Sequence, residues 1–236
     1  MSAAPDAPTP LLLSWSGGKD AAWTLHHLNQ DPRWQVVALL TTVTEGYERV
    51  AMQGIRRDVL LAQTEAAGLP LIEARMPQRA DNATYERCFA DALSKTRERF
   101  PGLRHLAFGD LFLEDIKHYR DALCARLDWT PVYPLFGSDT RTLARKMICG
   151  GLKATLCCVD TTQLDARFAG RAFDHALLDE LPEAIDPCGE NGEFHTCVHA
   201  GPFFSFALDV RIGERVLRDG RFMYTDVIQQ TPTSTP

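Results

Sequence analysis

The sequence contains no apolar run that approaches the roughly 18 residues needed to cross a bilayer as a helix. It also lacks a positively charged start followed by an apolar stretch, so the N-terminus does not resemble a signal peptide. Basic residues are not in excess: 25 Lys and Arg stand against 31 Asp and Glu, for a net charge of −6. This balance disfavours a protein that coats nucleic acid or an anionic membrane. We therefore expect neither membrane association nor bulk nucleic-acid binding.

Paired C-x-x-C motifs are also absent, and the seven cysteines are an odd number scattered along the chain. Without a signal peptide, such cysteines indicate reduced thiols in a cytoplasmic protein and not a disulfide framework. Cys188, His195, Cys197 and His199 lie close together in the sequence. Three ligands that alternate on one strand face would span about 13 Å, which is too long for one tetrahedral zinc ion. We expect no structural metal there.

What the sequence does contain is ordinary globular composition, with 45% hydrophobic and 24% charged residues. A chain of 236 residues can bury a substantial core, as one large domain or two small ones. Residues 1–10 are rich in Ala and Pro and residues 229–236 in Thr, Pro and Gln. We expect both ends to be disordered tails.

From residue 11 to residue 134 the hydrophobic pattern alternates between short apolar runs and helical spacing. The apolar runs predict strands over 11–15, 35–43, 69–76 and 105–112. The helical spacings predict helices from about Asp20, around 55–66, from Asp81 or Asn82 to 100, and around 116–127. Four strands that alternate with four helices predict an α/β fold with an open, mostly parallel sheet.

The pattern changes after Pro134. A helix over 139–149 and a strand over 154–159 continue the α/β theme, and strands then predominate over 203–211, 215–217 and 222–228, with a turn near Gly213. The pair Asp219-Gly220 between two of these runs predicts a β-hairpin. We therefore predict a smaller α+β second domain over 135–228. No linker separates it from the first domain, which indicates that the two share a rigid cleft.

The strongest local signal is a glycine turn between the first strand and the first helix, Ser16-Gly17-Gly18-Lys19-Asp20. Such a turn aims backbone N–H groups and the positive end of a helix at one point, which suits a phosphate. A carboxylate beside phosphates would repel them unless a Mg²⁺ ion lies between, so Asp20 is the predicted metal ligand. A tight turn that needs glycine only for steric reasons is the alternative, and the Walker pattern is absent.

Two further segments carry polar groups that a core would not hold. Gly109-Asp110 follows the fourth predicted strand, and the carboxyl ends of parallel strands are where open α/β folds bind ligands. The loop 185–196 reads Ile-Asp-Pro-Cys-Gly-Glu-Asn-Gly-Glu-Phe-His-Thr. Its two carboxylates, Glu190 and Glu193, and the imidazole of His195 could ligate a cation, hold an amine or move protons. A solvated surface loop is the alternative.

The glycine turn is similar to the pyrophosphate-loop signature S-G-G-x-D-S of the N-type ATP pyrophosphatases, which belong to the adenine nucleotide α-hydrolase-like superfamily. One position departs from it, because Ala21 stands where the signature has its last serine. The stretch Asp-Pro-Cys-Gly-Glu-Asn-Gly-Glu-Phe-His-Thr resembles the signature of the diphthine–ammonia ligase-like family. Residues 108–110, 133–136 and 150–154 agree in order with other motifs of that family, and the resemblance covers about residues 11–228.

The resemblance implies a HUP-type, Rossmann-like ATP-binding domain and an AMP-forming amide ligase. ATP would adenylate a carboxylate, pyrophosphate would leave, and ammonia would displace AMP, with Mg²⁺ as cofactor. In members that act on diphthine, the carboxylate belongs to translation elongation factor 2. The residues that would hold the nucleotide are Ser14, Ser16, Gly17, Gly18, Lys19, Asp20, Gly109 and Asp110. Those that would act on acceptor and ammonia are Glu190, Asn191, Glu193 and His195.

Two other functions stay open at this point. One is an ATP pyrophosphatase that modifies another substrate such as transfer RNA, which the net charge of −6 and the lack of C-x-x-C pairs disfavour. The other is a nucleotide-binding regulator without hydrolysis, which has little need for the acidic loop. The sequence leaves the acceptor and the oligomeric state undecided, and a homodimer is one arrangement open to it.

Overall fold

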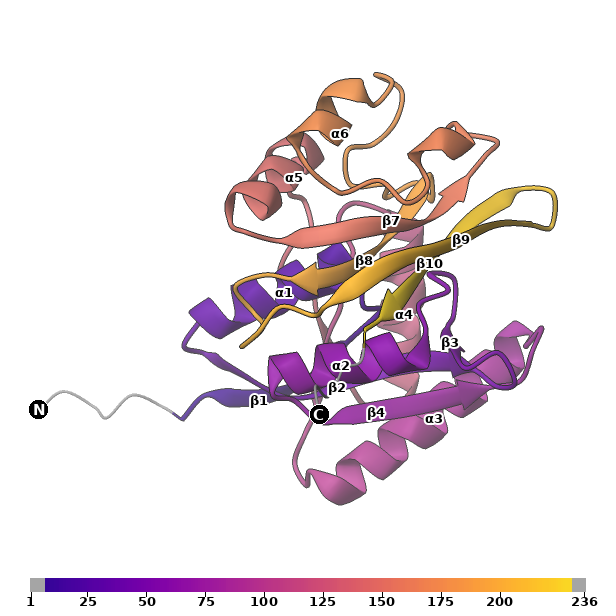
Figure 1. Cartoon of the computed structure of the whole chain (residues 1–236). Coiled ribbons are helices and arrows are strands. Elements are labelled where there is room, and N and C mark those ends of the chain that lie inside the picture. The colour runs from indigo at the N-terminus through magenta and orange to yellow at the C-terminus, as the bar shows by residue number, and fades with distance from the viewer. Residues whose placement is uncertain (1–6, 231–236) are drawn as a thin grey trace, which may run out of the picture.

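The structure is a computed structural model that describes residues 7–230. Two sheets make up the framework, and the predicted mixed α/β class with a mostly parallel sheet is confirmed (Figure 1). Most of the two predicted tails lies outside the described residues. The first strand nevertheless begins at Thr9 and the last ends at Gln229. Thr9 extends the strand because its N–H donates to the carbonyl of Arg33 at 2.8 Å.

The first sheet, sheet A, has six strands in the order β3-β2-β1-β5-β6, and β4 also pairs with β2. All pairs are parallel except β2 with the short β3. The strands are β1 Thr9–Ser14, β2 Trp34–Thr44, β3 Arg49–Val50, β4 Leu71–Met76, β5 His105–Ala107 and β6 Thr130–Val132. The helices between them are α1 Lys19–Gln30, α2 Arg57–Ala67, α3 Asn82–Arg99 and α4 Glu114–Arg126. Asp81 caps α3 by accepting the N–H of Thr84.

The second sheet, sheet B, is antiparallel with the order β8-β7-β10-β9. Its strands are β7 Lys153–Asp160, β8 Phe194–Ala200, β9 Val210–Arg218 and β10 Phe222–Gln229. Two helices, α5 Thr140–Cys149 and α6 His175–Glu180, and the 3-10 turn Ala166–Phe168 belong to the same part of the chain. How the chain divides into domains stays a prediction.

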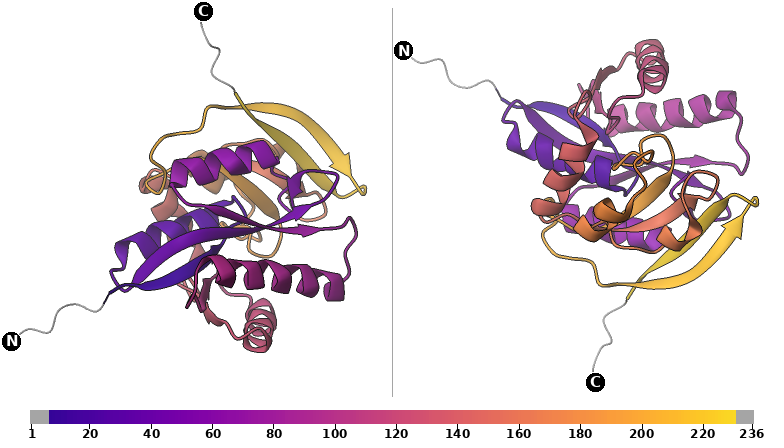
Figure 2. Two further views of the ribbon diagram at one scale, coloured as in Figure 1. Left: turned by 90° about the horizontal axis from the view of Figure 1, so that it is seen from below. Right: turned by 90° about the horizontal axis from the view of Figure 1, so that it is seen from above.

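The elements stack in layers (Figures 1 and 2), with two hydrophobic clusters between them. Helices α1 and α2 lie between the two sheets, α3 and α4 cover the far face of sheet A, and α5 and α6 lie beyond sheet B. Strand β1 shows how the sequence sets this up. Leu11 and Leu13 face the cluster between the sheets, whereas Leu12 faces the cluster under α3 and α4. The inner cluster runs on without a break to Leu156 and Val198 of sheet B.

Three predicted boundaries were wrong for physical reasons. The strand predicted over 105–112 ends at Ala107, where Gly109 approaches the start of α1. The strand predicted over 203–211 begins only at Val210, because residues 203–205 turn inward and Ser205 bonds to α2. No turn occurs at Gly213. Instead β9 runs through a β-bulge there, in which two residues lie opposite Asp226.

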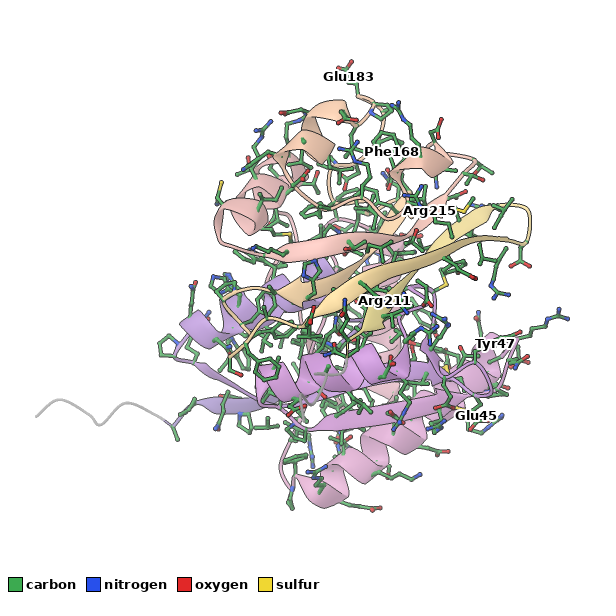
Figure 3. The ribbon with its side chains drawn as sticks, viewed as in Figure 1. Glu45, Tyr47, Phe168, Glu183, Arg211 and Arg215 are labelled. Atoms are coloured by element: carbon green, nitrogen blue, oxygen red, sulfur yellow. The ribbon has the colours of Figure 1, made fainter. Side chains whose placement is uncertain are left out.

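The hairpin predicted at Asp219-Gly220 is confirmed. It joins β9 to β10 through residues 219–221, and both Asp219 and Gly220 have positive φ, 52° and 61°, which a tight turn between strands favours. This hairpin and the loop that carries Tyr47 project on the same side of the molecule (Figure 3).

Candidate active site

The glycine turn lies between the end of β1 and the first turn of α1. Gly17 has a φ of +76°, which a residue with a side chain rarely adopts. Gly18 precedes the helix. The N–H of Lys19 donates to Oγ1 of Thr196 at 3.0 Å, whereas the next N–H groups of the first helical turn have no intrahelical partner and lie at the positive end of the helix. This is the geometry that a phosphate group requires.

Lys19 is buried under this turn, although lysines are rarely buried without a partner. Its Nζ lies 2.8 Å from Oδ2 of Asp20 and above the rings of Phe173 and Phe194, at 5.8 and 5.6 Å from their centroids. Burial lowers the pKa of Lys19, but Asp20, Cys188 and Glu190 together outweigh burial and raise this pKa above its ordinary value. The site therefore contains a permanent positive charge.

Asp20 has one engaged and one free carboxylate oxygen. Oδ2 accepts from Lys19, whereas Oδ1 is buried without a hydrogen-bond partner among the described residues. Those residues contain no cluster of three or more His, Cys, Asp or Glu placed to hold a metal. Mg²⁺ needs no such cluster, because it commonly takes one or two carboxylates and completes its shell with phosphate oxygens and water. The free oxygen of Asp20 fits that role.

The second contribution comes from the end of β5. A Cβ on Gly109 would lie 3.0 Å from the carbonyl carbon of Asp20 and 3.1 Å from the N of Ala21. Only glycine therefore lets this segment pass so close to the turn. Asp110 forms an ion pair with Arg120 of α4, with 2.7 Å between Oδ2 and Nε. The Arg120 guanidinium also stacks on Phe108, 4.3 Å from the ring centroid.

The third contribution is the acidic loop. Glu190 reaches across to the strand end, where its Oε1 accepts the N–H of Leu111 at 2.8 Å. Burial raises the pKa of Glu190 to about 7, with a further upward contribution from Asp20, although the Leu111 hydrogen bond acts in the opposite direction. A carboxylate with this pKa can both release and accept a proton near neutral pH.

Glu193 and Asn191 have a different position from Glu190. Glu193 is 1% exposed, and its Oε1 accepts from the N–H of Asp186 at 3.0 Å and from Nδ2 of Asn191 at 3.1 Å. These bonds join the two ends of the loop. Neither Glu193 nor Asn191 lines the cavity described below. Their geometry is that of residues that hold the loop in shape.

His195 is the second residue of β8, next to the loop. Burial, with the positive charge of Lys19 adding to it, lowers the pKa of His195 to about 4. The imidazole is therefore neutral at physiological pH, so it can accept a proton or a hydrogen bond but does not add charge to the site.

A cavity of about 230 Å³ joins these segments. Nine of the twelve predicted site residues line it: Ser14, Ser16, Gly18, Lys19, Asp20, Gly109, Asp110, Glu190 and His195. Gly17 lies behind the turn with its carbonyl in the core. Segments that are far apart in the sequence thus meet at one point, which only the tertiary fold reveals.

Several lining residues were missed from the sequence: Gln53, Phe108, Leu113, Arg120, Cys188 and Thr196. Arg120 carried no usable signal, because it stands in a highly charged helix and its partner belongs to another segment. Thr196 accepts the N–H of Lys19 at 3.0 Å, and its place directly after the acidic loop was the available hint. A second hollow of about 730 Å³, between the Tyr47 loop and the β9–β10 hairpin, contains none of the predicted site residues.

Comparisons with known proteins agree over nearly the whole described chain. The family model described as diphthamide synthase N-terminal domain matches residues 11–130, and that described as diphthamide synthase C-terminal domain matches residues 139–228. A diphthine–ammonia ligase of Schizosaccharomyces pombe is 25% identical over 206 residues, which are 80% of this chain and 34% of that protein. A diphthine–ammonia ligase of Rattus norvegicus is 24% identical over 226 residues, 86% of this chain and 83% of that protein. The chain thus spans about a third of the length of the fission-yeast relative.

Proposed function

The chain belongs to the diphthamide synthase family, and on that basis we propose that it is an ATP-dependent, AMP-forming ligase that joins ammonia to a carboxylate. One observation carries the proposal: the glycine turn, the end of β5 and the acidic loop line the same cavity. Such a cavity can hold the nucleotide phosphates and the reacting carboxylate together. The relatives named above are diphthine–ammonia ligases, so the proposed acceptor is the diphthine carboxylate of elongation factor 2.

In the first step the acceptor carboxylate oxygen attacks the α-phosphorus of ATP, the bond to the bridging oxygen breaks, and pyrophosphate leaves. The N–H groups of the first turn of α1 that follow Lys19, and the Lys19 ammonium, lie where they can stabilise the negative charge on the leaving group. A Mg²⁺ ion held by Oδ1 of Asp20 would supply further positive charge at the phosphates.

In the second step the nitrogen of ammonia attacks the activated acyl carbon, the bond to AMP breaks, and the attacking nitrogen loses a proton. Glu190 is the proposed acceptor of that proton, because its carboxylate lines the cavity and its pKa of about 7 suits transfer in both directions. The same carboxylate can bind an ammonium ion before that ion loses its proton. Glu193 and Asn191 would act through the loop that they brace.

The test is to incubate the protein with ATP, Mg²⁺, ammonium and diphthine-bearing elongation factor 2. Repeated release of AMP and pyrophosphate should need all components, and the elongation factor should show the mass change of carboxylate to amide. ADP as the main nucleotide product would contradict the proposed bond cleavage. AMP formation without amide on this acceptor would retain the chemistry but refute the substrate.

A further inference from the structure

Gln63 is a polar residue on the buried face of α2, with none of its surface exposed. Its side-chain amide is fully engaged. Nε2 donates to the carbonyl of Gly17 at 3.0 Å and to the carbonyl of Val198 at 2.7 Å. Oε1 accepts from Nε1 of Trp15 at 3.2 Å. One side chain thus connects β1, the glycine turn and strand β8 of the second sheet.

The bond to Gly17 matters because of peptide geometry. In a trans peptide the C=O of one residue and the N–H of the next point in opposite directions. A carbonyl of Gly17 that is held in the core therefore aims the N–H of Gly18 outward. In the structure this N–H donates to Oγ of Ser16 at 3.3 Å, and Ser16 lines the cavity. The direction of the Gly17 C=O bond therefore sets the direction of the Gly18 N–H bond.

The Gly17–Gly18 peptide can also rotate more easily than a peptide between two residues with side chains. Both flanking residues are glycines, which tolerate conformations that other residues avoid. A rotated peptide would point a carbonyl oxygen at the cavity, where it would repel a phosphate. The N–H of Val198 also donates to the Gly17 carbonyl, at 3.0 Å, so two donors hold this oxygen in place.

We propose that Gln63 is a positioning residue for phosphate binding: it keeps the Gly17–Gly18 peptide oriented with its N–H, and not its C=O, toward the nucleotide phosphates. The inference rests on the proposed function, because it takes the turn as the phosphate site. It concerns a residue outside the cavity, since Gln63 does not line it. A methionine would fill a similar volume but could not donate to either carbonyl.

The experiment compares the affinities of ATP with Mg²⁺ and of adenosine for the full-length protein, measured by calorimetry or competition. Adenosine has no phosphates, so it reports on the rest of the site. Gln63→Met should weaken ATP binding about tenfold, in line with the loss of one to two hydrogen bonds, and leave adenosine binding unchanged. Ser205→Ala is the matched control, because Ser205 Oγ donates to the Ala66 carbonyl of the same helix and neither residue lines the cavity.

Each result decides one question. Equal losses of ATP and adenosine affinity, or no loss of either, would overturn the positioning role. A wild-type protein that binds ATP no better than adenosine would instead refute the turn as a phosphate site, and with it the proposed function. Should Gln63→Met not fold, Trp15→Phe decides, since it removes the donor to Oε1 and keeps an aromatic ring at this buried position. It should lower ATP affinity about threefold and spare adenosine. An unchanged ATP affinity would count against the proposal.

Discussion

The Glu190 carboxylate accepts the main-chain N–H of Leu111 at 2.8 Å, across 79 positions of sequence. This bond ties the acidic loop to the segment that follows β5, where Asp110 lies. One oxygen of Glu190 is fixed by the bond, so the other is the one offered to a ligand in the cavity. The arrangement makes Glu190 and the glycine turn line the same cavity.

Glu190→Gln should therefore lower the rate of amide formation about 10²-fold or more, the usual contribution of a positioned acid or base. The wild-type rate should rise with pH through about 7, where Glu190 becomes a carboxylate. Free ammonia also increases with pH from pH 6 to 8, so the rates are compared at a constant concentration of free ammonia. Rates at saturating ATP over that range check the prediction. A Glu190→Gln profile with the same inflection would assign it to another group.

The same substitution should raise stability at alkaline pH. Burial raises the pKa of Glu190 from 4.5 to about 7, so between these values the folded state binds more protons than the unfolded state. Stability then falls as pH rises through this window. Gln removes the buried charge, and at pH 8 the variant should gain on the order of 2 kcal/mol, or roughly 5 °C in Tm. Thermal unfolding of the wild type and of Glu190→Gln at pH 5 and pH 8 measures this gain in stability. The gain should vanish at pH 5, and equal gains at both values would contradict the titration.

Glu193→Ala should behave differently from Glu190→Gln. It leaves the N–H of Asp186 and the amide of Asn191 without their acceptor, at a cost of about 1–3 kcal/mol. The expected result is a lower Tm together with a lower turnover, because the loop loses its shape. Melting curves and AMP formation measured on both variants separate the two roles. A Glu193→Ala protein with wild-type Tm but lost turnover would indicate direct participation in the chemistry.

The sequence predicts elements well where local chemistry decides. Leu11 to Leu13 alternate between two cores, and Asp219-Gly220 forms the hairpin. The turn predicted near Gly213 was wrong, because a glycine between strand residues suits either a turn or a bulge. Only the pairing with β10 distinguishes the two.

The candidate site, like the fold, could be predicted from the sequence only where local chemistry decides. The glycine turn and the acidic loop were visible as motifs, but their meeting depends on how the chain folds back. Arg120 depends on a partner from another element. Gln63 carried an unused signal, since it lies at helical spacing from Val59 and Ala66, both buried, and a polar residue on that face needs partners.

Gly109→Ala should weaken ATP binding although residue 109 need not touch the nucleotide. Its Cβ would lie 3.0 to 3.1 Å from backbone atoms of Asp20 and Ala21, which cannot move aside as a side chain would. The start of α1 must shift, and its N–H groups shift with it. We expect a loss of about tenfold in ATP affinity. Gly102→Ala is the control, because its φ of +87° makes it strained as well, but nothing lies within 4 Å. It should lower Tm and spare ATP affinity, and equal affinity losses in both would point to general destabilisation.

Asp20→Asn tests the proposed magnesium ligand. The buried Oδ1 of Asp20 has no partner among the described residues, and a neutral amide is a poor ligand for Mg²⁺. The substitution also removes the charge opposite Lys19, so affinity must be measured both with Mg²⁺ and with a chelator. Wild type should bind ATP at least about tenfold more tightly with Mg²⁺, and Asp20→Asn should lose most of that difference. Asp81→Asn, at the cap of α3, should retain it. Loss of the ion pair with Lys19 alone would change the ATP affinity equally with Mg²⁺ and with the chelator. If Asp20→Asn keeps the full magnesium dependence, Asp20 therefore acts only through Lys19.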